Sequence, residues 1–492
     1  MNEVKHIRQL AGKKRIVFVS GNFNIVHPGH LRLLRFAKEC GDFLVIGVNC
    51  DGTEHPGAIL PEKERLEGVK ANIWVDYAFI LRQPVDRFIR ELKPVFVVKG
   101  KEHQKRDNIE KNAVESYGGS LVFSSGEASF SSLELLKLDS RTAIHEQQFE
   151  IHEYIKRHKI DVNKLISFFE KPSGKHIAVI GESIIDEYIN CEPLGLSREE
   201  PCMVVSPLNH IRFIGGAAIV AAHIATLGMP VHFLTLAGND DAGRFLCSEI
   251  QKTKISLSRF EDVTRPTIVK QRFRIDNRSL FRVSYLRQHE ISQSLQDAII
   301  DKLAEIMPSL NLLVFSDFNY GLLTPGLIQN ITAMAKKHKV MLLADSQVSS
   351  QHGDISRYHH TKLLTPTEHE ARTSLRDTQS GLVVLCEKLR SATNGENIFL
   401  KLGAEGMMIH AYDRKCKMWE TDRLPSTNPA PIDVAGAGDS ILACAAVLLV
   451  NGANIWEAAL CGTVGAGGQI SRIGNIPLRQ DEIIQLLRSY TD

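Results

Sequence analysis

Short apolar runs alternate with amphipathic stretches along the first 140 residues. Each run has the length of a buried strand, and the stretches between the runs repeat their apolar positions at helical spacing. The predicted strands lie at 15–20, 43–49, 77–81 and 95–100, and the predicted helices at 29–40, 61–72 and 84–92. Strands that alternate with helices are typical of βαβ units, which build a parallel sheet covered by helices. We therefore predict a small doubly wound α/β domain at residues 1–140.

A polar stretch with helical propensity follows and breaks at a proline and a glycine, and we predict a helical connector at residues 141–172. Apolar runs resume at 176–186 and recur along the rest of the chain, with helical segments between most of them. Residues 265–287 instead alternate β-forming residues with Arg and Lys, as a side sheet or lid would. We predict a larger α/β domain with a small β lid at residues 173–492.

The composition favours a small-molecule enzyme over a protein that binds polyanions. The chain has 59 Lys and Arg against 57 Asp and Glu, and the resulting net charge of +2 gives no basic surface for nucleic acid or an anionic membrane. Its nine cysteines include no C-x-x-C pair, which suits the reducing cytosol. No apolar run approaches the roughly 20 residues that span a bilayer, so we expect a cytoplasmic protein that binds no membrane.

The stretch VSGNFNIVHPGH, residues 19–30, joins the end of a predicted strand to the start of a helix. Free backbone N–H groups at a helix start favour an anion, and phosphate is the expected ligand. His27 and His30 are three residues apart, so both imidazoles can face this anion and stabilise the charge that develops during phosphoryl attack. Two histidines at this spacing are also half a zinc site, but no Cys or carboxylate at ligand spacing accompanies them.

This stretch resembles the G-x-F-D-x-x-H-x-G-H signature of nucleotidyltransferases, which join a nucleoside monophosphate to a sugar or polyol phosphate. The resemblance covers residues 14–138, through the segments LPEKERLEGVKAN, KPVFVVKGKEH and GEASFSSLELL, and is nearest to the adenylyltransferase half of bifunctional heptose enzymes. It implies a Rossmann-like domain in which His27 and His30 are catalytic. It also implies nucleotide or phosphate contacts from Gly21, Asn22, Phe23, Asn24, Gly29, Arg65, Lys99, Gly100, Ser131 and Ser132.

A second phosphate signal is DVAGAGDSILACAAVLL, residues 433–449. Gly436 and Gly438 let backbone N–H groups approach a phosphoryl group closely, and the apolar helix that follows adds the positive end of its dipole. Asp439 stands at the edge of this anion hole, where it can take the proton from a sugar hydroxyl that attacks ATP. An Asp at this place also commonly caps the helix, and the two roles are compatible.

DVAGAGDS resembles the D-T-x-G-A-G-D signature of ribokinase-like sugar kinases, with Val434 in place of Thr. The match covers residues 175–490, includes KLGAEG as the T-x-G-x-x-G nucleotide loop, and is similar in detail to heptose 7-phosphate kinases. The resemblance implies that Asp439 is the catalytic base and that Glu370 acts on Mg²⁺ through water. It implies sugar contacts from Asp186, Gly215 and Gly216, and nucleotide or phosphate contacts from Lys401, Gly403, Gly406, Gly436, Ala437 and Gly438.

Four places depart from the family patterns. Asn24 replaces an acid, Ile219 replaces an Asn that would touch sugar, Ser346-Gln347 replace Pro-Lys after Asp345, and Thr367 replaces the Asn of N-x-x-E. A lost sugar-facing hydrogen bond costs roughly 1 to 3 kcal/mol, so these departures leave the identity of the sugar open. The two halves also stand in the reverse of the order in bifunctional heptose enzymes, which carry the kinase first.

Our first interpretation is a bifunctional enzyme that phosphorylates a sugar or sugar phosphate with ATP and transfers AMP to a sugar 1-phosphate. A second is a kinase and cytidylyltransferase that makes a CDP-polyol, although the R-T-x-G-I-S-T segment of cytidylyltransferases is absent. A third is a degenerate sugar-nucleotide sensor or scaffold, which the retained His27, His30 and Asp439 oppose. We expect ATP and a sugar phosphate as ligands, Mg²⁺ as cofactor with K⁺ as a further candidate, no nucleic acid, and a homodimer.

Overall fold

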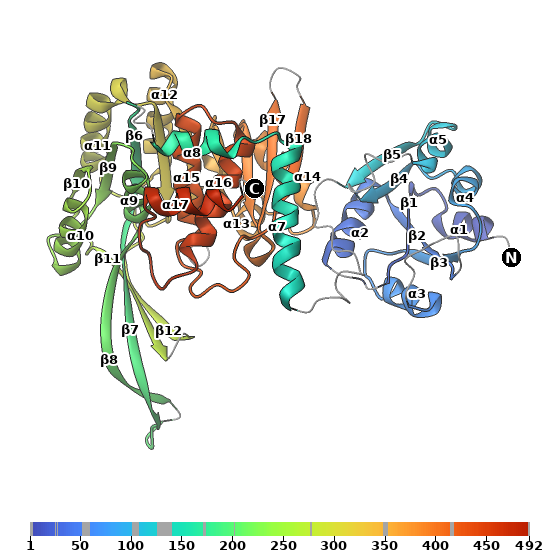
Figure 1. Ribbon diagram of the computed structural model, residues 1–492, viewed down its shortest axis with the longest axis horizontal. Coiled ribbons are helices and arrows are strands. Elements are labelled where there is room, and N and C mark those ends of the chain that lie inside the picture. Colours follow the sequence, from blue (N-terminus) through green and yellow to red (C-terminus); the bar gives the residue numbers. More distant parts are fainter. Residues whose placement is uncertain are drawn as a thin grey trace. The chain divides into compact units, whose positions relative to one another are not determined.

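The computed structural model describes residues 3–24, 26, 28–51, 60–100, 108–124, 140–170, 174–200, 202–275, 278–347, 353–413 and 418–490. They form two compact units, a smaller one built mainly from residues 1–146 and a larger one built mainly from residues 147–492 (Figure 1). In the part of the chain that the structure describes, no helix combines the length and apolar character needed to cross a bilayer. The eight cysteines described there carry free thiols.

The smaller unit is a five-stranded sheet of order β3-β2-β1-β4-β5, in which every neighbouring pair is parallel. The doubly wound prediction is therefore confirmed. Its strands are β1 (Ile16–Gly21), β2 (Phe43–Asn49), β3 (Tyr77–Leu81), β4 (Phe96–Gly100) and β5 (Ser120–Ser124). Its helices are α1 (Glu3–Ala11), α2 (Pro28–Cys40), α3 (Glu62–Lys70), α4 (Val85–Leu92) and α5 (Ile109–Glu115).

Both faces of this sheet are buried, as the continuous apolar runs of its strands require. Successive residues of a strand point to opposite faces, so Phe18 packs in one apolar cluster and Val17 and Val19 in another. The order of the strands reverses between β1 and β4. Ligands of doubly wound sheets bind at such a point, outside the carboxyl ends of the strands.

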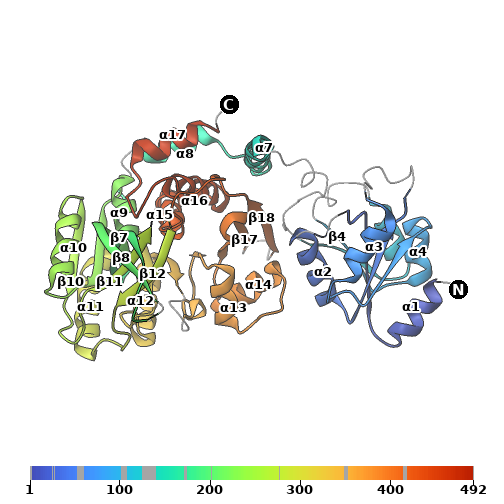
Figure 2. The same ribbon diagram turned by 90° about the horizontal axis from the view of Figure 1, so that it is seen from below.

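The larger unit is built on a nine-stranded sheet of order β10-β9-β6-β13-β14-β15-β16-β17-β18, parallel from β10 to β16, with β17 antiparallel to β16. Helices α15 and α16 lie on one side of it and α12 and α14 on the other (Figure 2). The strands are β6 (Ile177–Gly181), β9 (Val231–Leu236), β10 (Ile255–Phe260), β13 (Leu312–Asp317), β14 (Met341–Ser346), β15 (Leu363–Leu364), β16 (Asn397–Lys401), β17 (Met407–Asp413) and β18 (Met418–Leu424).

The helices of the larger unit include the apolar helix predicted within residues 433–449, which is α15 and is largely buried. They are α9 (Ala217–Thr226), α10 (Asp241–Gln251), α11 (Gln293–Ile306), α12 (Pro325–His338), α13 (Glu368–Leu375), α14 (Leu382–Thr393), α15 (Ala437–Val450), α16 (Ile455–Gln469) and α17 (Gln480–Arg488), with short 3₁₀ turns η2 (Met307–Ser309), η3 (Ile355–Arg357) and η4 (Gly403–Glu405).

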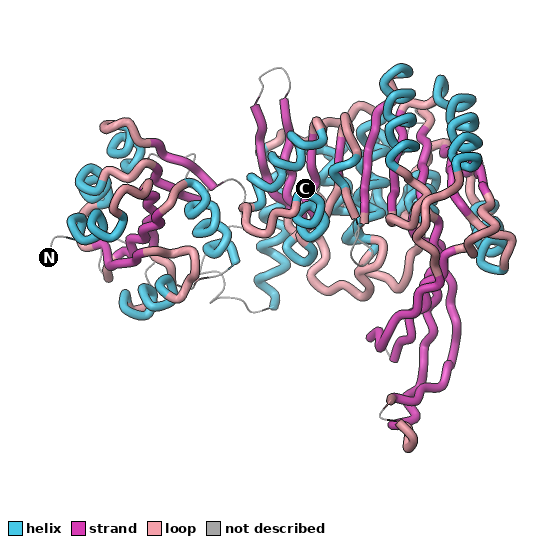
Figure 3. The backbone as a smooth tube through the Cα atoms, turned by 180° about the vertical axis from the view of Figure 1, so that it is seen from behind, coloured by secondary structure: helices cyan, strands magenta, loops and turns pink. Residues whose placement is uncertain are grey.

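A separate four-stranded sheet forms the predicted lid. It has the order β12-β11-β7-β8 and comprises β7 (Ser183–Leu196), β8 (Met203–Gly216), β11 (Ile268–Ile275) and β12 (Arg278–Tyr285). Its strands extend away from the body of the unit (Figure 3). The prediction from 265–287 found only half of this sheet. Asp186, expected from the resemblance on the opening strand of the domain, instead lies on β7, next to that strand in the chain.

The predicted connector contains two helices, α7 (Ser140–Arg157) and α8 (Val162–Glu170), and from Gln147 onward they belong to the larger unit. Tyr154 of α7 and Leu165 of α8 are fully buried in the apolar core of that unit. The Tyr154 hydroxyl donates to the carbonyl of Trp456 at 3.1 Å, and Lys164 Nζ lies 2.9 Å from Glu457 Oε1. From about its middle onward, the connector is therefore part of the larger unit's core.

Candidate active sites

Four charged side chains meet near the carboxyl ends of β14 and β16 in the larger unit. Asp345 lies on β14 and Lys401 ends β16, and Lys401 Nζ is 2.8 Å from Asp345 Oδ1. Glu370 from α13 and Asp439 from α15 lie close enough to act electrostatically on the Lys401 ammonium. The structure thus brings together three residues that the sequence selected separately and adds the carboxylate of Asp345.

Asp439 has the environment of a general base. It lies in the first turn of α15, is 7% exposed, and its Oδ1 has no hydrogen-bond partner among the described residues. Burial and the neighbouring Asp345 carboxylate raise the pKa of Asp439 to about 7, although Lys401 opposes the shift. The N-cap of α15 is Gly436, so Asp439 does not serve as the cap. A carboxylate with an unpaired oxygen and a pKa near 7 is suited to proton abstraction.

Both glycines before Asp439 lie against polar side chains, and Gly436 is required there by its backbone conformation. Gly436 has a φ of +79°, and a Cβ on it would lie 2.5 Å from Asn475 Oδ1. A Cβ on Gly438 would lie 3.1 Å from Lys401 Nζ. The turn Gly436-Ala437-Gly438 therefore passes between Asn475 and Lys401 and presents only its backbone and one methyl group there.

Glu370 is held by the start of α13 in a capping box. Thr367 Oγ1 accepts from the Glu370 N–H at 3.2 Å, and Glu370 Oε2 accepts from the Thr367 N–H at 2.7 Å. The replacement of the family's Asn by Thr367 therefore preserves the helix start. Burial raises the pKa of Glu370; Lys401 opposes this shift, and Asp345 adds to it.

The donor set beside Lys401 fits Mg²⁺ held mainly through water and phosphate. Carboxylate oxygens are the ligands that Mg²⁺ prefers, and Glu370 supplies a carboxylate beside Lys401. Within the described ranges no three His, Cys, Asp or Glu side chains are placed to hold a metal ion by themselves. Mg²⁺ usually keeps several waters and binds through one or two carboxylates and substrate phosphates, which agrees with this arrangement.

The expected sugar contacts lie where the lid meets the body of the unit. Asp186 is 5% exposed; Arg272 Nη2 lies 3.5 Å from its Oδ1, and Asn475 Nδ2 donates to its Oδ2 at 3.2 Å. Burial raises the pKa of Asp186, and the cations of Arg272 and Lys270 oppose the shift. A Cβ on Gly215 would lie 2.3 Å from Asp186 Oδ2, so this approach requires glycine.

Asn475, between α16 and α17, is a site residue that the sequence reasoning missed. It is 6% exposed. Because a carboxylate only accepts hydrogen bonds, the amide nitrogen faces Asp186 and the amide oxygen faces Gly436. That oxygen is buried and has no hydrogen-bond partner in the described part of the chain. It is therefore placed to accept a hydrogen bond from a substrate hydroxyl. No recognised motif includes Asn475, and only its position after a positive-φ Gly474 sets it apart.

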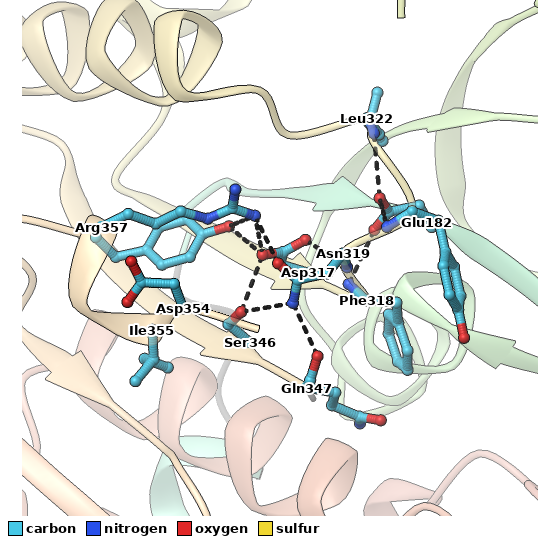
Figure 4. A network of polar contacts seen from close by, with 12 residues as sticks. Glu182, Asp317, Phe318, Asn319, Leu322, Ser346, Gln347, Asp354, Ile355 and Arg357 are labelled. Atoms are coloured by element: carbon cyan, nitrogen blue, oxygen red, sulfur yellow. Dashed lines mark hydrogen bonds and ion pairs between the residues drawn. The ribbon is translucent and has the colours of Figure 1, made fainter. Parts of the chain in front are cut away.

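Ser346 and Gln347 belong to a polar network at the ends of β13 and β14 (Figure 4). Asp317 accepts from the Ser346 hydroxyl at 3.0 Å and from the Tyr358 hydroxyl at 2.7 Å, and it forms an ion pair with Arg357. The Gln347 N–H donates to the Asp317 carbonyl at 2.8 Å. Ser346 and Gln347, which replace the family's Pro-Lys, thus both form hydrogen bonds with Asp317.

Glu182 fixes the loop after β13 from the other side of this network (Figure 4). Its carboxylate accepts from the backbone N–H groups of Phe318 at 2.9 Å, Tyr320 at 3.1 Å and Leu322 at 3.2 Å. Burial and the neighbouring Asp317 raise the pKa of Glu182 to about 7, against the effect of these hydrogen bonds. The loop is therefore held by one buried carboxyl group.

The remaining predicted residues of this unit lie on the same elements. Gly216 is the N-cap of α9, and Ile219 in that helix is fully buried in the apolar core. Gly403 begins η4 and Gly406 follows it in the turn between β16 and β17, and both have positive φ. Their contacts with substrates remain predictions.

In the smaller unit, Gly21 ends β1 and Lys99 and Gly100 end β4, the two strands at which the sheet order reverses. Lys99 Nζ lies 2.6 Å from Glu110 Oε1, and both side chains are largely buried. A substrate phosphate at this edge would share Lys99 with Glu110. The predicted residues therefore lie at the expected place, and their roles remain predictions.

Arg65 positions the loop after β1. The residue is 1% exposed, its Nη1 donates to the Asn22 carbonyl at 2.6 Å, and its Nη2 lies 2.7 Å from Asp51 Oδ1. Its Nε donates to the Leu60 carbonyl at 2.7 Å. Asn49 Nδ2 donates to Asn22 Oδ1 at 2.8 Å on the same loop. A direct phosphate contact from Arg65 remains a prediction.

His30 lies in the first turn of α2, after Gly29, as the sequence predicted. Its ring centroid is 5.0 Å from that of Phe23, which adopts a left-handed φ of 49°. Asn24 is 5% exposed. The predicted residues His27, Ser131 and Ser132 lie outside the described residues.

Two family models match the chain. Residues 175–480 match the pfkB family carbohydrate kinase model, and residues 18–121 match the cytidylyltransferase-like model.

The curated relatives include the bifunctional protein HldE of Geotalea uraniireducens, 28% identical over 322 residues, which are 65% of this chain and 64% of that protein. HldE of Trichlorobacter lovleyi is 26% identical over 330 residues, 66% of this chain and 65% of that protein. The chain thus matches slightly less than two thirds of the length of these relatives.

Solved structures support the fold of the larger unit. Ribokinase from Thermotoga maritima is similar with a TM-score of 0.51 at 22% identity, covering 64% of this chain and 99% of that chain. Phosphofructokinase-2 from Escherichia coli, in complex with potassium, gives a TM-score of 0.54 at 13% identity over 65% of this chain and 99% of that chain.

Proposed function

The chain belongs to the pfkB family of carbohydrate kinases, and we propose that it is a bifunctional sugar-activating enzyme. The larger unit transfers the γ-phosphoryl group of ATP to a hydroxyl group of a heptose 7-phosphate-like sugar or sugar phosphate. The smaller unit transfers AMP from ATP to a sugar 1-phosphate and releases pyrophosphate. The product is a nucleotide-activated sugar for surface polysaccharide synthesis. The relatives that are named as bifunctional support this pairing.

The environment of Asp439 is the observation that carries the kinase proposal. Its Oδ1 is buried and without a hydrogen-bond partner in the described residues, at the start of α15 and beside the Lys401 ammonium. A protein that only binds a sugar nucleotide has no need of a buried carboxylate with an unpaired oxygen at this place, because that group is costly to keep. This favours a kinase over a sensor.

The kinase mechanism follows from these positions. Asp439 accepts the proton of the substrate hydroxyl as that oxygen attacks the γ-phosphorus, and the bond from the γ-phosphorus to the bridging oxygen breaks to leave ADP. The backbone at Gly436–Gly438 and the start of α15 stabilise the negative charge on the transferred group. Asp186 and Asn475 orient the sugar through its hydroxyl groups.

The cation requirements follow from the same side chains. Glu370 would hold Mg²⁺ through water, and Mg²⁺ when bound would supply positive charge to the phosphoryl oxygens. K⁺ is a further candidate cation, since the solved phosphofructokinase-2 contains potassium. We further propose a cytoplasmic location, which the free thiols of the eight described cysteines suit.

The adenylyltransferase proposal rests on the edge of the sheet between β1 and β4. His30 stands at the start of α2, where a helix dipole and an imidazole favour a nucleotide phosphate. Arg65 stiffens the loop from which this site is built. The choice of ATP over CTP is part of the proposal and rests on the relatives and on the absence of the cytidylyltransferase segment.

The test incubates the purified chain with ATP or CTP and Mg²⁺. The acceptors are heptose 7-phosphate, heptose 1-phosphate and a panel of polyol phosphates, and mass spectrometry follows ADP and pyrophosphate separately. ADP with a heptose phosphate and pyrophosphate with ATP support the proposal. Pyrophosphate with CTP alone supports the CDP-polyol alternative, and no product across the panel supports the sensor.

Two variants separate the sites. Asp439→Asn abolishes ADP formation and leaves pyrophosphate formation intact, because only the kinase base is lost. His30→Ala has the opposite effect. Loss of both activities in either folded variant would contradict the two-site proposal.

A further inference from the structure

The family patterns differ from this chain at Gln347 and at Lys401, and the second of these side chains contacts the carboxylate of Asp345. Gln347 stands where the related kinases carry a lysine, two residues after Asp345, and Lys401 stands where the nucleotide loop carries a threonine. In the structure, the ammonium group of Lys401 contacts the carboxylate of Asp345, with Nζ 2.8 Å from Oδ1. Compared with the family patterns, this chain therefore lacks a lysine just after β14, at Gln347, and has an additional lysine at the end of β16, at Lys401.

The position of the Lys401 ammonium is fixed by its surroundings. The Lys401 side chain is 11% exposed and that of Asp345 is 3% exposed. Burial alone would lower the pKa of Lys401, but the carboxylates of Asp345 and Glu370 raise it above its usual value, so the side chain is charged. A Cβ on Gly438 would lie 3.1 Å from Lys401 Nζ, which places the charge against the turn expected to bind phosphate.

The charge balance shows why a cation is needed there. Asp345, Glu370 and Asp439 are buried acids around this one ammonium, and a triphosphate adds further negative charge. Gln347 is uncharged, and its backbone is bound to the end of β13. Lys270 of the lid also acts on Asp439, but it stacks on the rings of Phe318 and Tyr320, at 5.3 Å and 5.4 Å from their centroids.

We propose that Lys401 is the cation of this protein for the phosphates of ATP in the kinase site and compensates for the lysine that is missing at Gln347. This inference rests on the proposed kinase function. Lys401 holds Asp345 when the site is empty, and it donates to phosphate oxygens when ATP is bound. It is thus a nucleotide-binding residue that this chain has relocated from one strand end to another.

The test is titration of the full-length chain with adenylyl imidodiphosphate in the presence of Mg²⁺, followed by calorimetry. The wild-type chain is expected to show two sites, one in each unit. Lys401→Thr, which restores the family residue, weakens one of them at least about tenfold, as loss of a charged contact worth about 1.4 kcal/mol would. The double variant Lys401→Thr/Gln347→Lys regains it.

Lys362→Thr is the matched control. Lys362 Nζ forms an ion pair of 2.5 Å with Glu396 and precedes β15, so this change also breaks a lysine ion pair of the larger unit. It should leave both sites intact. Calorimetric melting of every variant shows whether the fold is retained.

Kinetics provide a second readout that a structural role would not reproduce. Lys401→Thr should raise KM for ATP in ADP formation and leave KM for the sugar phosphate unchanged. Two unchanged sites in Lys401→Thr, or failure of Gln347→Lys to restore binding in a folded double variant, would overturn the inference. A wild-type chain with one site that survives Lys401→Thr would overturn the kinase function as well.

Discussion

At the scale of single residues, burial determines which groups of this protein can do chemistry. Asp439 and Asn475 each keep one oxygen buried and without a hydrogen-bond partner in the described residues, and both flank the Gly436–Gly438 turn. An unpaired buried polar atom costs about 1 to 3 kcal/mol. Two such atoms at one turn are best explained by a substrate that satisfies both when it binds.

The pKa of Asp439 predicts how the kinase responds to pH. Burial raises this pKa to about 7, and the base acts only when deprotonated. The rate of ADP formation should therefore rise about tenfold per pH unit below pH 7 and level off above it. Pyrophosphate formation, measured on the same samples, provides the control. A flat rate of ADP formation across pH 7 would contradict the assignment of Asp439 as the base.

Asn475→Ala should weaken binding of the sugar. The change removes the amide that bridges Asp186 and the substrate, a loss of about 1 to 3 kcal/mol or roughly tenfold or more in KM for the sugar phosphate. KM for ATP should not change. Asn190→Ala is the control. Asn190 lies on β7, the strand of Asp186, and its Nδ2 donates to Asn209 Oδ1 at 2.7 Å. An equal effect of both changes would indicate a general disturbance of the lid.

At the scale of elements, helix starts position the chemistry. The capping box at α13 fixes Glu370, and the start of α15 fixes Asp439. Thr367 stands where the family's N-x-x-E pattern has Asn. Because Thr and Asn are both good N-caps, the structure explains how the replacement leaves the carboxylate in place.

Thr367→Asn should therefore be nearly neutral, whereas Thr367→Ala should destabilise the larger unit by about 1 kcal/mol. The alanine variant loses the hydroxyl that accepts from the Glu370 N–H. Scanning calorimetry of the full-length chain measures both effects. If alanine proved as stable as threonine, the cap would contribute nothing to the helix.

The sequence predicted elements well where the information was local. Continuous apolar runs located four of the five strands of the smaller unit and the buried helix α15, but they did not reveal β5. The hairpin of β7 and β8 was missed. Most of β8 is exposed, so buried and exposed positions do not alternate along it, and its pairing with β7 is a tertiary contact. Half of the lid was thus invisible in the sequence.

The site could likewise be predicted only where its residues lie in local sequence motifs. Motifs located Asp439, Glu370 and Lys401, since each lies in a recognisable pattern. Asn475 lies 289 residues from Asp186 in the chain and becomes its partner only through the fold. The ion pair of Lys99 with Glu110 likewise joins elements that no motif connects.

At the scale of the whole molecule, the lid exposes several large apolar side chains. Leu196 is 75% exposed and Leu208 is 66% exposed on β7 and β8, and Phe281 on β12 is 50% exposed. Apolar side chains gathered on one small sheet favour burial against a partner. The homodimer expected from the resemblance would cover them.

Leu196→Asp/Leu208→Asp should therefore convert the dimer into a monomer, because each carboxylate would lose hydration in the interface. Light scattering of the full-length chain measures the mass. Ile73→Asp is the control, since Ile73 is 89% exposed and lies in the smaller unit. An unchanged dimer in the double variant would place the interface elsewhere.

The packing of α7 and α8 determines where this chain can be divided. Ile151, Tyr154, Leu165 and Phe169 are at most 4% exposed within the larger unit. A kinase fragment that starts at residue 173, where the composition changes, would leave their binding surface bare and should aggregate. A fragment that starts at residue 148 should fold, as gel filtration would show. The boundary between the two units thus falls inside α7, and any excision of the larger unit must keep the second half of that helix together with α8.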